Sequence, residues 1–331
     1  MQQHNKLINK LKGPIIIFGA GGFVGFNLLQ KLLTYRKDVF GVFSVPKKNW
    51  RLREKYTSPL YVVKCDIRER SALKSLISRS KPKTVFNLAA YGAYSTQNDI
   101  NNIYQTNFNS TYLLLEEMKK YGFSAYVHAG SQSEYGLNSS GPSEKDELVP
   151  NSHYAVSKVA SYYLLKYYGK VEKLPVAHLR LYSVYGSWEE PNRLIPTLIR
   201  EAKKGKLPKF VDPNISRDFV YVEDVCGAFI RSAVLLKSNP QGLTKYEPAN
   251  PEGLQIFGEA FNVCSGKKTT IKELAYLAKK LFKIKQEPKF GSMRNRTWDL
   301  KDWYGNPKKI QKSINWKART TLMVGLKILM N

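Results

Sequence analysis

A run of glycines between two apolar segments restricts the folds open to this chain more than any other feature of its sequence. Residues 14–18, PIIIF, form a short isoleucine-rich run of the kind found in buried parallel strands. The turn GAGGFVG comes next, and residues 26–35 then carry apolar side chains at helical spacing. Strand, glycine turn and helix in this order predict the first unit of a dinucleotide-binding fold.

The spacing of these glycines departs from the fingerprint G-x-G-x-x-G, because Val24 stands where the third glycine belongs. Gly19, Gly22 and Gly25 fit G-x-x-G-x-x-G instead. Glycine permits a tight turn and lets backbone N–H groups approach a pyrophosphate, and the helix N-terminus then attracts the negative charge. We therefore expect a dinucleotide site here rather than a glycine-rich turn that binds nothing.

The end of the second predicted strand bears on the choice of cofactor. An NAD-binding unit usually ends this strand, here residues 39–44, with an Asp or Glu that holds the ribose 2′-hydroxyl. Phe43 and Ser44 stand there instead, and Lys47 and Lys48 follow. With no carboxylate to repel a 2′-phosphate, NADP(H) is favoured and NAD(H) is possible. The alternative is that the two lysines are simply solvated.

Strand and helix patterns alternate along the next ninety residues. Further strands are expected at 60–67, 84–90 and 124–131, and helices at 69–80 and 109–122. This alternation predicts an α/β fold with a doubly wound parallel sheet. Ligands on such sheets bind beyond the carboxyl ends of the strands. The residues expected at those ends are Asn87, Ala89, Ala90, Tyr91 and Ser131.

Tyr154 and Lys158 form one of four Y-x-x-x-K pairs, a number that chance explains in a chain rich in both residues. Residues 151–170 are predicted as one helix with Ser152 as its N-cap, so Tyr154 and Lys158 share a face near the mouth of the sheet. One of the other pairs lies further along this helix, another lies on a predicted surface helix, and the last is interrupted by Gly305 and Pro307. We assign those three to chance: Tyr162/Lys166, Tyr276/Lys280 and Tyr304/Lys308.

Tyr154 and Lys158 could act together in proton transfer. A nearby lysine cation lowers the pKa of a phenol from about 10, so that Tyr154 could exchange protons near neutral pH. The loop GSQSEYG offers the Ser131 hydroxyl to hold a substrate oxygen. Ser, Tyr and Lys around a nicotinamide suffice to interconvert a carbonyl and an alcohol.

Over nearly its whole length the chain resembles the extended short-chain dehydrogenase/reductase family, in particular its nucleotide-sugar epimerases, dehydratases and reductases. The matching stretches are FGAGGFVG, CDI, NLAA, NFNSTYLLLE, GSQSEYG, YAVSK, LRLYSVYG, RDFVYVEDV, FNVCSG and KKIQKSINWKARTTL. The resemblance implies a Rossmann-type domain over residues 1–185, to which 217–236 return, and a smaller nucleotide-sugar-binding α/β lobe over 186–331. It also implies a homodimer through helices that contain residues 109–120 and 162–169.

Residue by residue, the resemblance implies that Tyr154 is the catalytic acid or base, Lys158 orients it and the nicotinamide ribose, and Ser131 is the catalytic hydroxyl. The cofactor-binding positions that it implies are Gly19, Gly22, Phe23, Val24, Gly25, Ser44, Lys47, Asp66, Ile67, Leu88, Ala89, Ala90, Asn107, Tyr154 and Lys158. The substrate-binding positions are Tyr91, Ser133, Ser183, Arg193 and Arg217. Arg217 is expected at the phosphates of a nucleotide sugar rather than in a surface ion pair with Asp218.

Departures from the family pattern decide the expected reaction. Its 4,6-dehydratases carry an Asp-Glu pair after the catalytic hydroxyl, as the acid and base of dehydration. Gln132 and Ser133 stand there in this chain and Glu134 comes one position late, so a 4,6-dehydratase is not expected. Ser183 also replaces an asparagine found in many relatives. The serine loop and residues 298–307, WDLKDWYGNP, are most similar to reductases of 6-deoxy or dideoxy nucleotide sugars.

We therefore favour reduction of an NDP-4-keto-6-deoxyhexose, for surface polysaccharide or glycan synthesis. A 4-epimerase that retains NAD is the first alternative. The second is a basic RNA-binding or scaffold protein with the same fold, which the net charge of +27 supports. The basic residues are spread along the chain, however, and a scaffold has no need of Ser131, Tyr154 and Lys158, so we expect no nucleic-acid partner.

The remaining composition points to a cytoplasmic protein. Three scattered cysteines without a C-x-x-C pattern predict neither a disulfide framework nor a metal site. The lysine-flanked apolar run near the N-terminus has no small-x-small cleavage site after it, and no stretch is long and apolar enough to span a bilayer. We expect no membrane partner.

Overall fold

A seven-stranded parallel sheet in the order β12-β6-β5-β4-β1-β2-β3 forms the centre of the computed structural model. The structure describes residues 6–55, 58–241, 245–248, 256–291 and 300–331. The strands are β1 (Ile15–Phe18), β2 (Val39–Phe43), β3 (Val62–Lys64), β4 (Thr84–Asn87), β5 (Ala125–Ser131), β6 (Val176–Leu181) and β12 (Glu259–Val263). The predicted doubly wound sheet is confirmed, and its order reverses between β1 and β4, where such sheets bind ligands.

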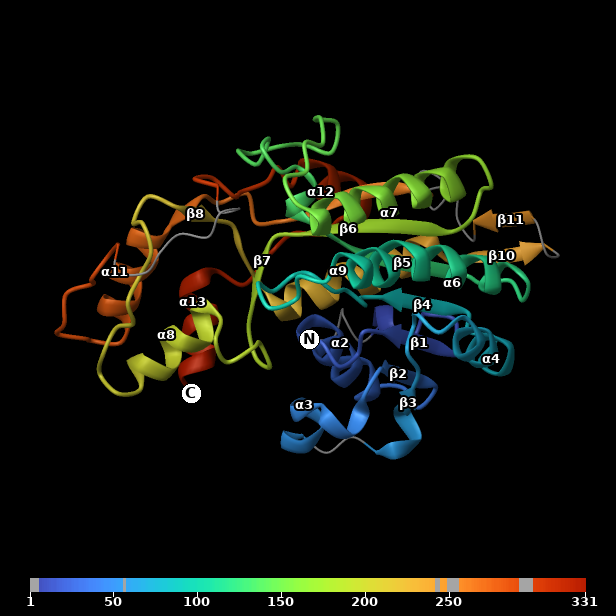
Figure 1. Ribbon diagram of the computed structural model, residues 1–331, viewed down its shortest axis with the longest axis horizontal. Coiled ribbons are helices and arrows are strands. Elements are labelled where there is room, and N and C mark those ends of the chain that lie inside the picture. The colour runs from blue at the N-terminus through green and yellow to red at the C-terminus, as the bar shows by residue number, and fades with distance from the viewer. Residues whose placement is uncertain (1–5, 56–57, 242–244, 249–255, 292–299) are drawn as a thin grey trace.

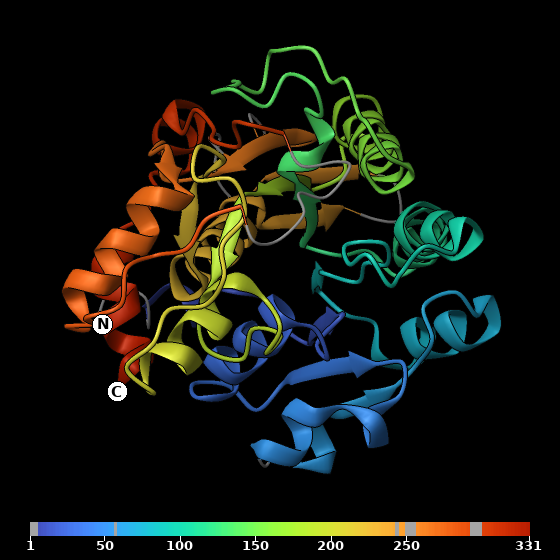
Figure 2. The ribbon, with the colours of Figure 1, turned by 60° about the vertical axis from the view of Figure 1, so that its left-hand side comes forward.

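Helices cover both faces of this sheet because its strands are apolar on both sides. On β1, Ile15 and Ile17 join one core, with α2 (Phe23–Leu33) and α9 (Val222–Leu236). Ile16 and Phe18 join a second core on the other face. Three helices pack there: α4 (Arg70–Ser80), α6 (Ser110–Lys119) and α7 (His153–Lys170). Figure 1 shows these layers, and Figure 2 turns them so that α6 and α7 are seen nearly end-on.

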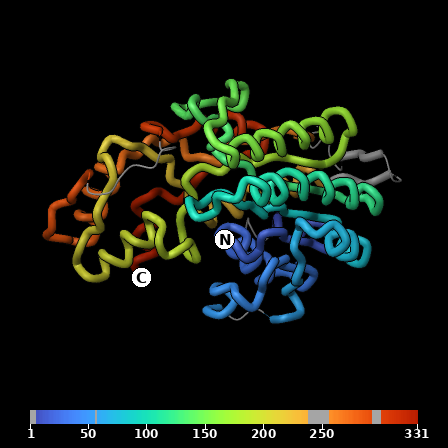
Figure 3. Tube along the Cα trace, viewed as in Figure 1, coloured from blue at the N-terminus to red at the C-terminus, as the bar shows by residue number. Residues whose placement is uncertain are grey.

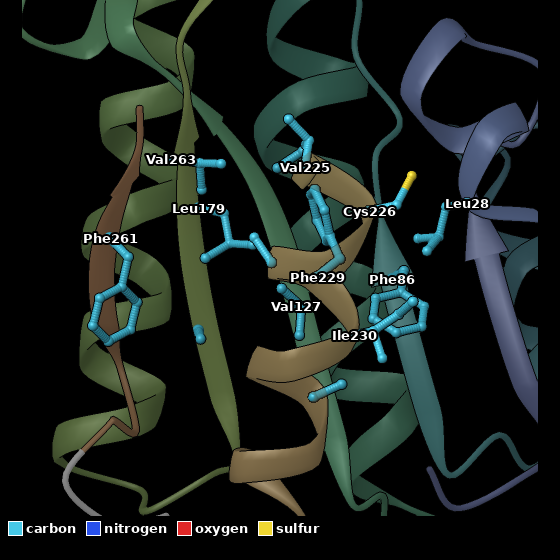
Figure 4. Close-up of a cluster of buried hydrophobic side chains, with 14 of the residues drawn as sticks. Leu28, Phe86, Val127, Leu179, Val225, Cys226, Phe229, Ile230, Phe261 and Val263 are labelled. Carbon is cyan, nitrogen blue, oxygen red and sulfur yellow. The ribbon is translucent and has the colours of Figure 1, made fainter. Parts of the chain in front are cut away.

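The core beneath α9 closes the sheet on the first face. Phe229 of α9 meets Phe86 of β4 edge to face, with the ring centroids 6.2 Å apart. Figure 4 shows Phe229 and Ile230 turned toward the strands, where Val127 of β5 lies. The helix α9, far along the chain, therefore packs against β4, β5 and β6.

The third strand is shorter than the sequence predicts. A strand is expected over 60–67, yet only Val62–Lys64 pair with β2, and Pro59–Tyr61 form a 3₁₀ turn. Proline has no N–H to donate to a ladder, and β3 lies at the edge of the sheet, where pairing is readily lost. The chain leaves the sheet before Asp66, which is consequently free to face the cleft described below.

A third core lies apart from the sheet. It joins α8 (Leu194–Ala202), α11 (Ile271–Leu281) and α13 (Leu322–Met330) through buried residues that include Ile195, Leu198, Leu274 and Leu326. In contrast, β12 and α12 (Lys308–Ile314) belong to the sheet's core. We propose that α8, α11 and α13 form the smaller lobe, visible on the left of Figure 1 and in the trace of Figure 3. None of the described helices has the length and apolar content needed to cross a bilayer.

Candidate active site

Two adjoining clefts open where the strands end. Described residues line a larger one of about 670 Å³ and a smaller one of about 440 Å³, and both are of a size usual for ligand sites. The larger brings together fourteen of the predicted residues: Gly19, Gly22, Phe23, Val24, Gly25, Leu88, Ala90, Ser131, Ser133, Tyr154, Lys158, Ser183, Arg193 and Arg217. The smaller adds Ser44, Asp66, Ile67, Ala89 and Tyr91.

The glycine turn has no room for a side chain at Gly19 or Gly25. Gly19 adopts φ +74°, which L side chains rarely take, and a Cβ on Gly25 would lie 2.2 Å from the Gly19 carbonyl oxygen. α2 starts directly after Gly22, which has no side chain to cap it, so the N–H groups of its first turn remain available beside the cleft. This cradle fits the pyrophosphate of a dinucleotide.

The smaller cleft has the polar groups expected around an adenosine. Ser44 follows β2, and the Asp66 carboxylate accepts hydrogen bonds from Arg68 Nε at 2.9 Å and from Nη2 at 2.6 Å. These bonds are the main reason why the pKa of Asp66 is lowered, so its carboxylate is charged at neutral pH. Lys47 is exposed and lines neither of the two clefts.

Asn107 also lies outside both clefts, but it hydrogen-bonds the backbone of Tyr91, which lines the smaller cleft. The Asn107 amide accepts from the Tyr91 N–H and donates to the Tyr91 carbonyl, both at 2.9 Å. It also donates to the Ser157 hydroxyl at 2.8 Å. Asn107 therefore fixes the loop after β4 that forms the floor of the smaller cleft.

Ser131, Tyr154 and Lys158 meet in the larger cleft. The Ser131 hydroxyl lies near enough to the Tyr154 phenol to lower its pKa. The Lys158 ammonium lies 5.9 Å from the centre of the Tyr154 ring and donates to the Ala129 carbonyl at 2.9 Å. Ser152 caps α7 by accepting from the Ala155 N–H, as predicted.

The protonation of this group differs from the prediction. The sequence predicts that Lys158 lowers the pKa of Tyr154, yet withdrawal of the phenol from water raises it to about 12, which the Ser131 hydrogen bond only partly offsets. Burial lowers the pKa of Lys158 to about 8. Burial outweighs charge here because the lysine lies beside the ring rather than at the hydroxyl. At neutral pH Tyr154 holds its proton.

The residues after Ser131 point in different directions. Gln132–Glu134 form a 3₁₀ turn in which Gln132 and Ser133 line the cleft. Glu134 turns inward and is fully buried against His178 and Arg180 of β6. The sequence did not reveal this orientation, because a turn interrupts the alternation of sides along a strand.

Residues at the ends of strands and helices beyond β6 supply another part of the larger cleft. Arg193, Arg217 and Ser183 line it together with three residues that the sequence did not single out: Tyr94, Glu189 and Trp303. The Arg193 guanidinium lies 5.5 Å from the Tyr94 ring centre, and burial raises the pKa of Glu189 to about 8. Of the reductase-like stretch 298–307, residues 298 and 299 lie outside the described residues, and Trp303 lines the cleft.

Arg217 and Asp218 do different things. Arg217 lines the cleft and donates to the Ser216 carbonyl at 2.8 Å. The buried Asp218 carboxylate accepts from the Ser265 hydroxyl at 2.6 Å and the Gly266 N–H at 2.9 Å. Asp218 thereby binds the loop after β12, and Arg217 is left on the side of the cleft.

Arg51 connects the glycine turn to the loop after β7 (Ser183–Tyr185), another contact that the sequence did not reveal. Its guanidinium, 2% exposed, donates to the carbonyls of Gly21 at 3.0 Å and Trp188 at 2.8 Å. It also pairs with the Glu190 carboxylate at 2.9 Å. The glycine turn and the loop after β7 are thus held to the same side chain.

Comparisons with known proteins agree with this geometry. A sequence model of the "NAD dependent epimerase/dehydratase family" matches residues 15–244. Protein CapI of Staphylococcus aureus is 25% identical over 325 residues, which cover 94% of this chain and 96% of that protein. The dTDP-glucose 4,6-dehydratase of Haemophilus influenzae is 30% identical over 230 residues, covering 63% of this chain and 68% of that enzyme.

Solved structures share the fold. The UDP-glucuronic acid 4-epimerase of Bacillus cereus, in complex with UDP-glucuronic acid and NAD, superimposes with a TM-score of 0.76 at 23% identity. The match covers 95% of this chain and 96% of that one.

Proposed function

This chain belongs to the NAD-dependent epimerase/dehydratase family, and from that premise we propose that it reduces the 4-keto group of an NDP-4-keto-6-deoxyhexose with a reduced nicotinamide dinucleotide. Tyr154 carries the proposal: its phenol keeps its proton at neutral pH and lines the same cleft as the Ser131 hydroxyl. A protonated phenol is the group that must give a proton to the carbonyl oxygen as a hydride reaches its carbon. The product would serve surface polysaccharide or glycan synthesis.

The following residues of the two clefts have separate roles in the proposed reaction. The bound nicotinamide supplies the hydride. The glycine turn and the uncapped start of α2 hold its pyrophosphate, and Asp66 lies on the adenine side. Ser131 positions the substrate carbonyl oxygen, Tyr154 donates the proton to it, and Lys158 orients the nicotinamide ribose and stabilises the phenolate left behind. Arg193 and Arg217 are the groups proposed for the substrate's phosphates.

Dehydration fits the cleft less well. It needs an acid for the C6 hydroxyl and a base for the C5 proton. Gln132 and Ser133 offer neither, and Glu134 is turned into the protein core. Glu189 lines the cleft as a single carboxyl, with its Oε1 3.8 Å from Arg193 Nε. A 4-epimerase with retained NAD is the second candidate, favoured by the epimerase fold match. An RNA-binding scaffold would leave the Ser131–Tyr154 pair without a use.

The reductase and the epimerase differ in what they consume. With NADPH and a set of nucleotide-4-keto-6-deoxysugars, we expect loss of the reduced-nicotinamide absorbance in proportion to substrate, and a reduced sugar by mass spectrometry. Heat-inactivated protein is the control. A protein that is purified with tightly held NAD and isomerises a nucleotide sugar without net oxidation would be an epimerase instead.

We propose NADP(H) as the cofactor because Ser44, not a carboxylate, follows β2 in the smaller cleft. Ser44→Asp should weaken NADPH binding about tenfold or more, since it places a carboxylate beside the 2′-phosphate, and should leave NADH binding unchanged or stronger. Ser44→Asn is the matched neutral control. Titration of both cofactors by fluorescence gives the ratio, and a wild-type protein that binds NADH more tightly than NADPH would contradict the assignment.

The outer face of α6 and α7 is the proposed dimer surface. Four large side chains on it are exposed by 39–54% of their area: Tyr112, Val156, Tyr163 and Tyr167. Contiguous exposed apolar side chains of this size usually mark a contact surface. A second copy of the chain, pairing the same two helices, is the occupant that the family resemblance implies.

A further inference from the structure

A fully buried charge cluster lies directly beneath Ser131, and the reaction proposed above does not use it. Glu134 Oε1 accepts from the Ser131 N–H at 2.8 Å and lies 2.8 Å from His178 Nε2. Glu134 Oε2 accepts from Arg180 Nε at 2.7 Å. All three side chains are 0% exposed. The cluster therefore links the end of β5, which bears Ser131, to the middle of β6.

The carboxylate in this cluster is charged. Burial alone would raise the pKa of Glu134, but His178 and Arg180 outweigh it and lower the pKa to about 2. Burial lowers the pKa of His178, so this imidazole is neutral. Glu134 and Arg180 are consequently a buried ion pair, and a neutral histidine lies against the other carboxylate oxygen.

Stability does not account for the cluster. A buried ion pair rarely stabilises a fold more than apolar side chains of the same volume would. Moreover, His178 Nδ1, Arg180 Nη2 and His128 Nε2 are buried without a hydrogen-bond partner among the described residues, and each such atom carries a desolvation cost. Groups of this kind are expected where they serve geometry or function rather than stability.

The cluster leaves the backbone around Ser131 no freedom. A Cβ on Gly130 would lie 2.2 Å from His178 Nε2 and 2.5 Å from Glu134 Oε1, so the two side chains pack directly on the main chain. The Ser131 hydroxyl in turn accepts from the Ser133 N–H at 3.1 Å, which completes a capping box with Glu134. The direction of the Ser131 side chain toward Tyr154 thus depends on the Glu134 carboxylate.

We propose that Glu134 is a positioning residue for the reaction at Tyr154: anchored on β6 by Arg180 and His178, its carboxylate fixes the main chain of Ser131 and so holds the serine hydroxyl against the phenol. The inference rests on the proposed function, in which Tyr154 donates the proton and Ser131 positions the carbonyl oxygen. Glu134 touches neither substrate nor cofactor in this arrangement.

The charge of Glu134 also acts on the pair that it positions. Glu134, Lys158, Tyr94 and Arg193 are charged or titratable groups that face Tyr154, and Glu134 and Tyr94 raise its pKa. Glu134, His128 and His178 face Lys158, and Glu134 raises the lysine's pKa. Removing the negative charge therefore lowers both pKa values. Because reduction needs protonated Tyr154, the alkaline limb of its pH profile then moves to lower pH.

Glu134→Gln and Glu134→Ala separate the two effects. Gln keeps an oxygen that can accept from the Ser131 N–H but has no charge, whereas Ala has neither. We expect kcat to fall about 100-fold in the Ala variant and less in the Gln variant, with KM for NADPH unchanged in both, since a small displacement of a catalytic group costs about that factor. In the Gln variant the alkaline limb should also move to lower pH.

Glu259→Gln is the matched control. Its carboxylate likewise binds two cations, Lys170 at 2.5 Å and Lys309 at 2.6 Å, but it lies at the opposite end of the sheet, at the start of β12. This variant should lose thermal stability without a change in kcat or in the pH profile. All assays are run well below the lowest melting temperature of the set.

The outcomes distinguish this inference from the proposed function. If the Glu134 variants have a lower melting temperature but the kcat and pH profile of the wild type, the cluster has only a structural role and the inference is overturned. Failure of both Glu134 variants to fold would overturn it as well. Tyr154→Phe is measured in parallel. If this variant keeps its activity, the proposed function fails. If it is inactive while both Glu134 variants are fully active, only the positioning role of Glu134 is refuted.

Discussion

Tyr154→Phe should reduce kcat for the 4-keto sugar by about 10²–10⁴-fold, the usual contribution of a positioned general acid. The substitution removes one oxygen, which bears the proton proposed for transfer and whose pKa the Ser131 hydroxyl lowers. It leaves the aromatic ring and the start of α7 unchanged. Because the pKa of the phenol is about 12 and that of Lys158 about 8, the alkaline fall in wild-type activity should follow the loss of the Lys158 cation, and the activity of Tyr154→Phe should be low at every pH.

The measurement is steady-state oxidation of NADPH over a range of pH, with cofactor affinity measured separately. Tyr276→Phe is the control, since Tyr276 also begins a Y-x-x-x-K pair but is 44% exposed on α11. We expect that control to match the wild type. A Tyr154→Phe variant with undiminished kcat would show that another group donates the proton, and would remove the main support for reduction.

Local patterns were enough to predict the architecture around this tyrosine. The run IIIF is apolar at every position because β1 is covered on both faces, and Ser152 caps α7 because its oxygen accepts from the helix's first free N–H groups. Both features depend on residues within a few positions of one another. The strand predicted at 60–67 is longer than the observed one. Pro59 and the position at the edge of the sheet, not the apolar pattern, determine where strand pairing stops.

The contacts that shape the cleft could not be predicted, because they join residues far apart in the sequence or depend on burial. Arg51 meets Trp188 and Glu190, nearly 140 positions away, and no local pattern marks that meeting. Glu134 turns inward because the chain leaves β5 in a 3₁₀ turn, after which alternation of sides no longer applies. The pKa of Tyr154 was predicted with the wrong sign, since charge is visible in a sequence and burial is not.

Cofactor binding should be nearly abolished by Gly25→Ala. The added Cβ would lie 2.2 Å from the Gly19 carbonyl oxygen, a backbone atom that can move only if the turn opens. Opening the turn displaces the N–H groups that face the pyrophosphate, so we expect NADPH to bind at least about 100-fold more weakly, equivalent to about 2.7 kcal/mol. A ligand that binds only the folded state stabilises it by RT ln(1 + [L]/Kd), so the same change should also reduce the rise in melting temperature that NADPH causes.

Gly22→Ala provides the graded comparison for this prediction. Its Cβ would come only within 3.3 Å of the same carbonyl oxygen, so a shift of a few tenths of an ångström relieves the contact and the loss of affinity should be smaller. Calorimetric titration with NADPH, together with melting curves of the free proteins, separates lost binding from lost folding. If Gly25→Ala folds and binds NADPH like the wild type, the pyrophosphate does not lie against this turn. The assignment of the larger cleft to a dinucleotide would then have to be abandoned, because the close approach of Gly25 to Gly19 is the feature on which it depends.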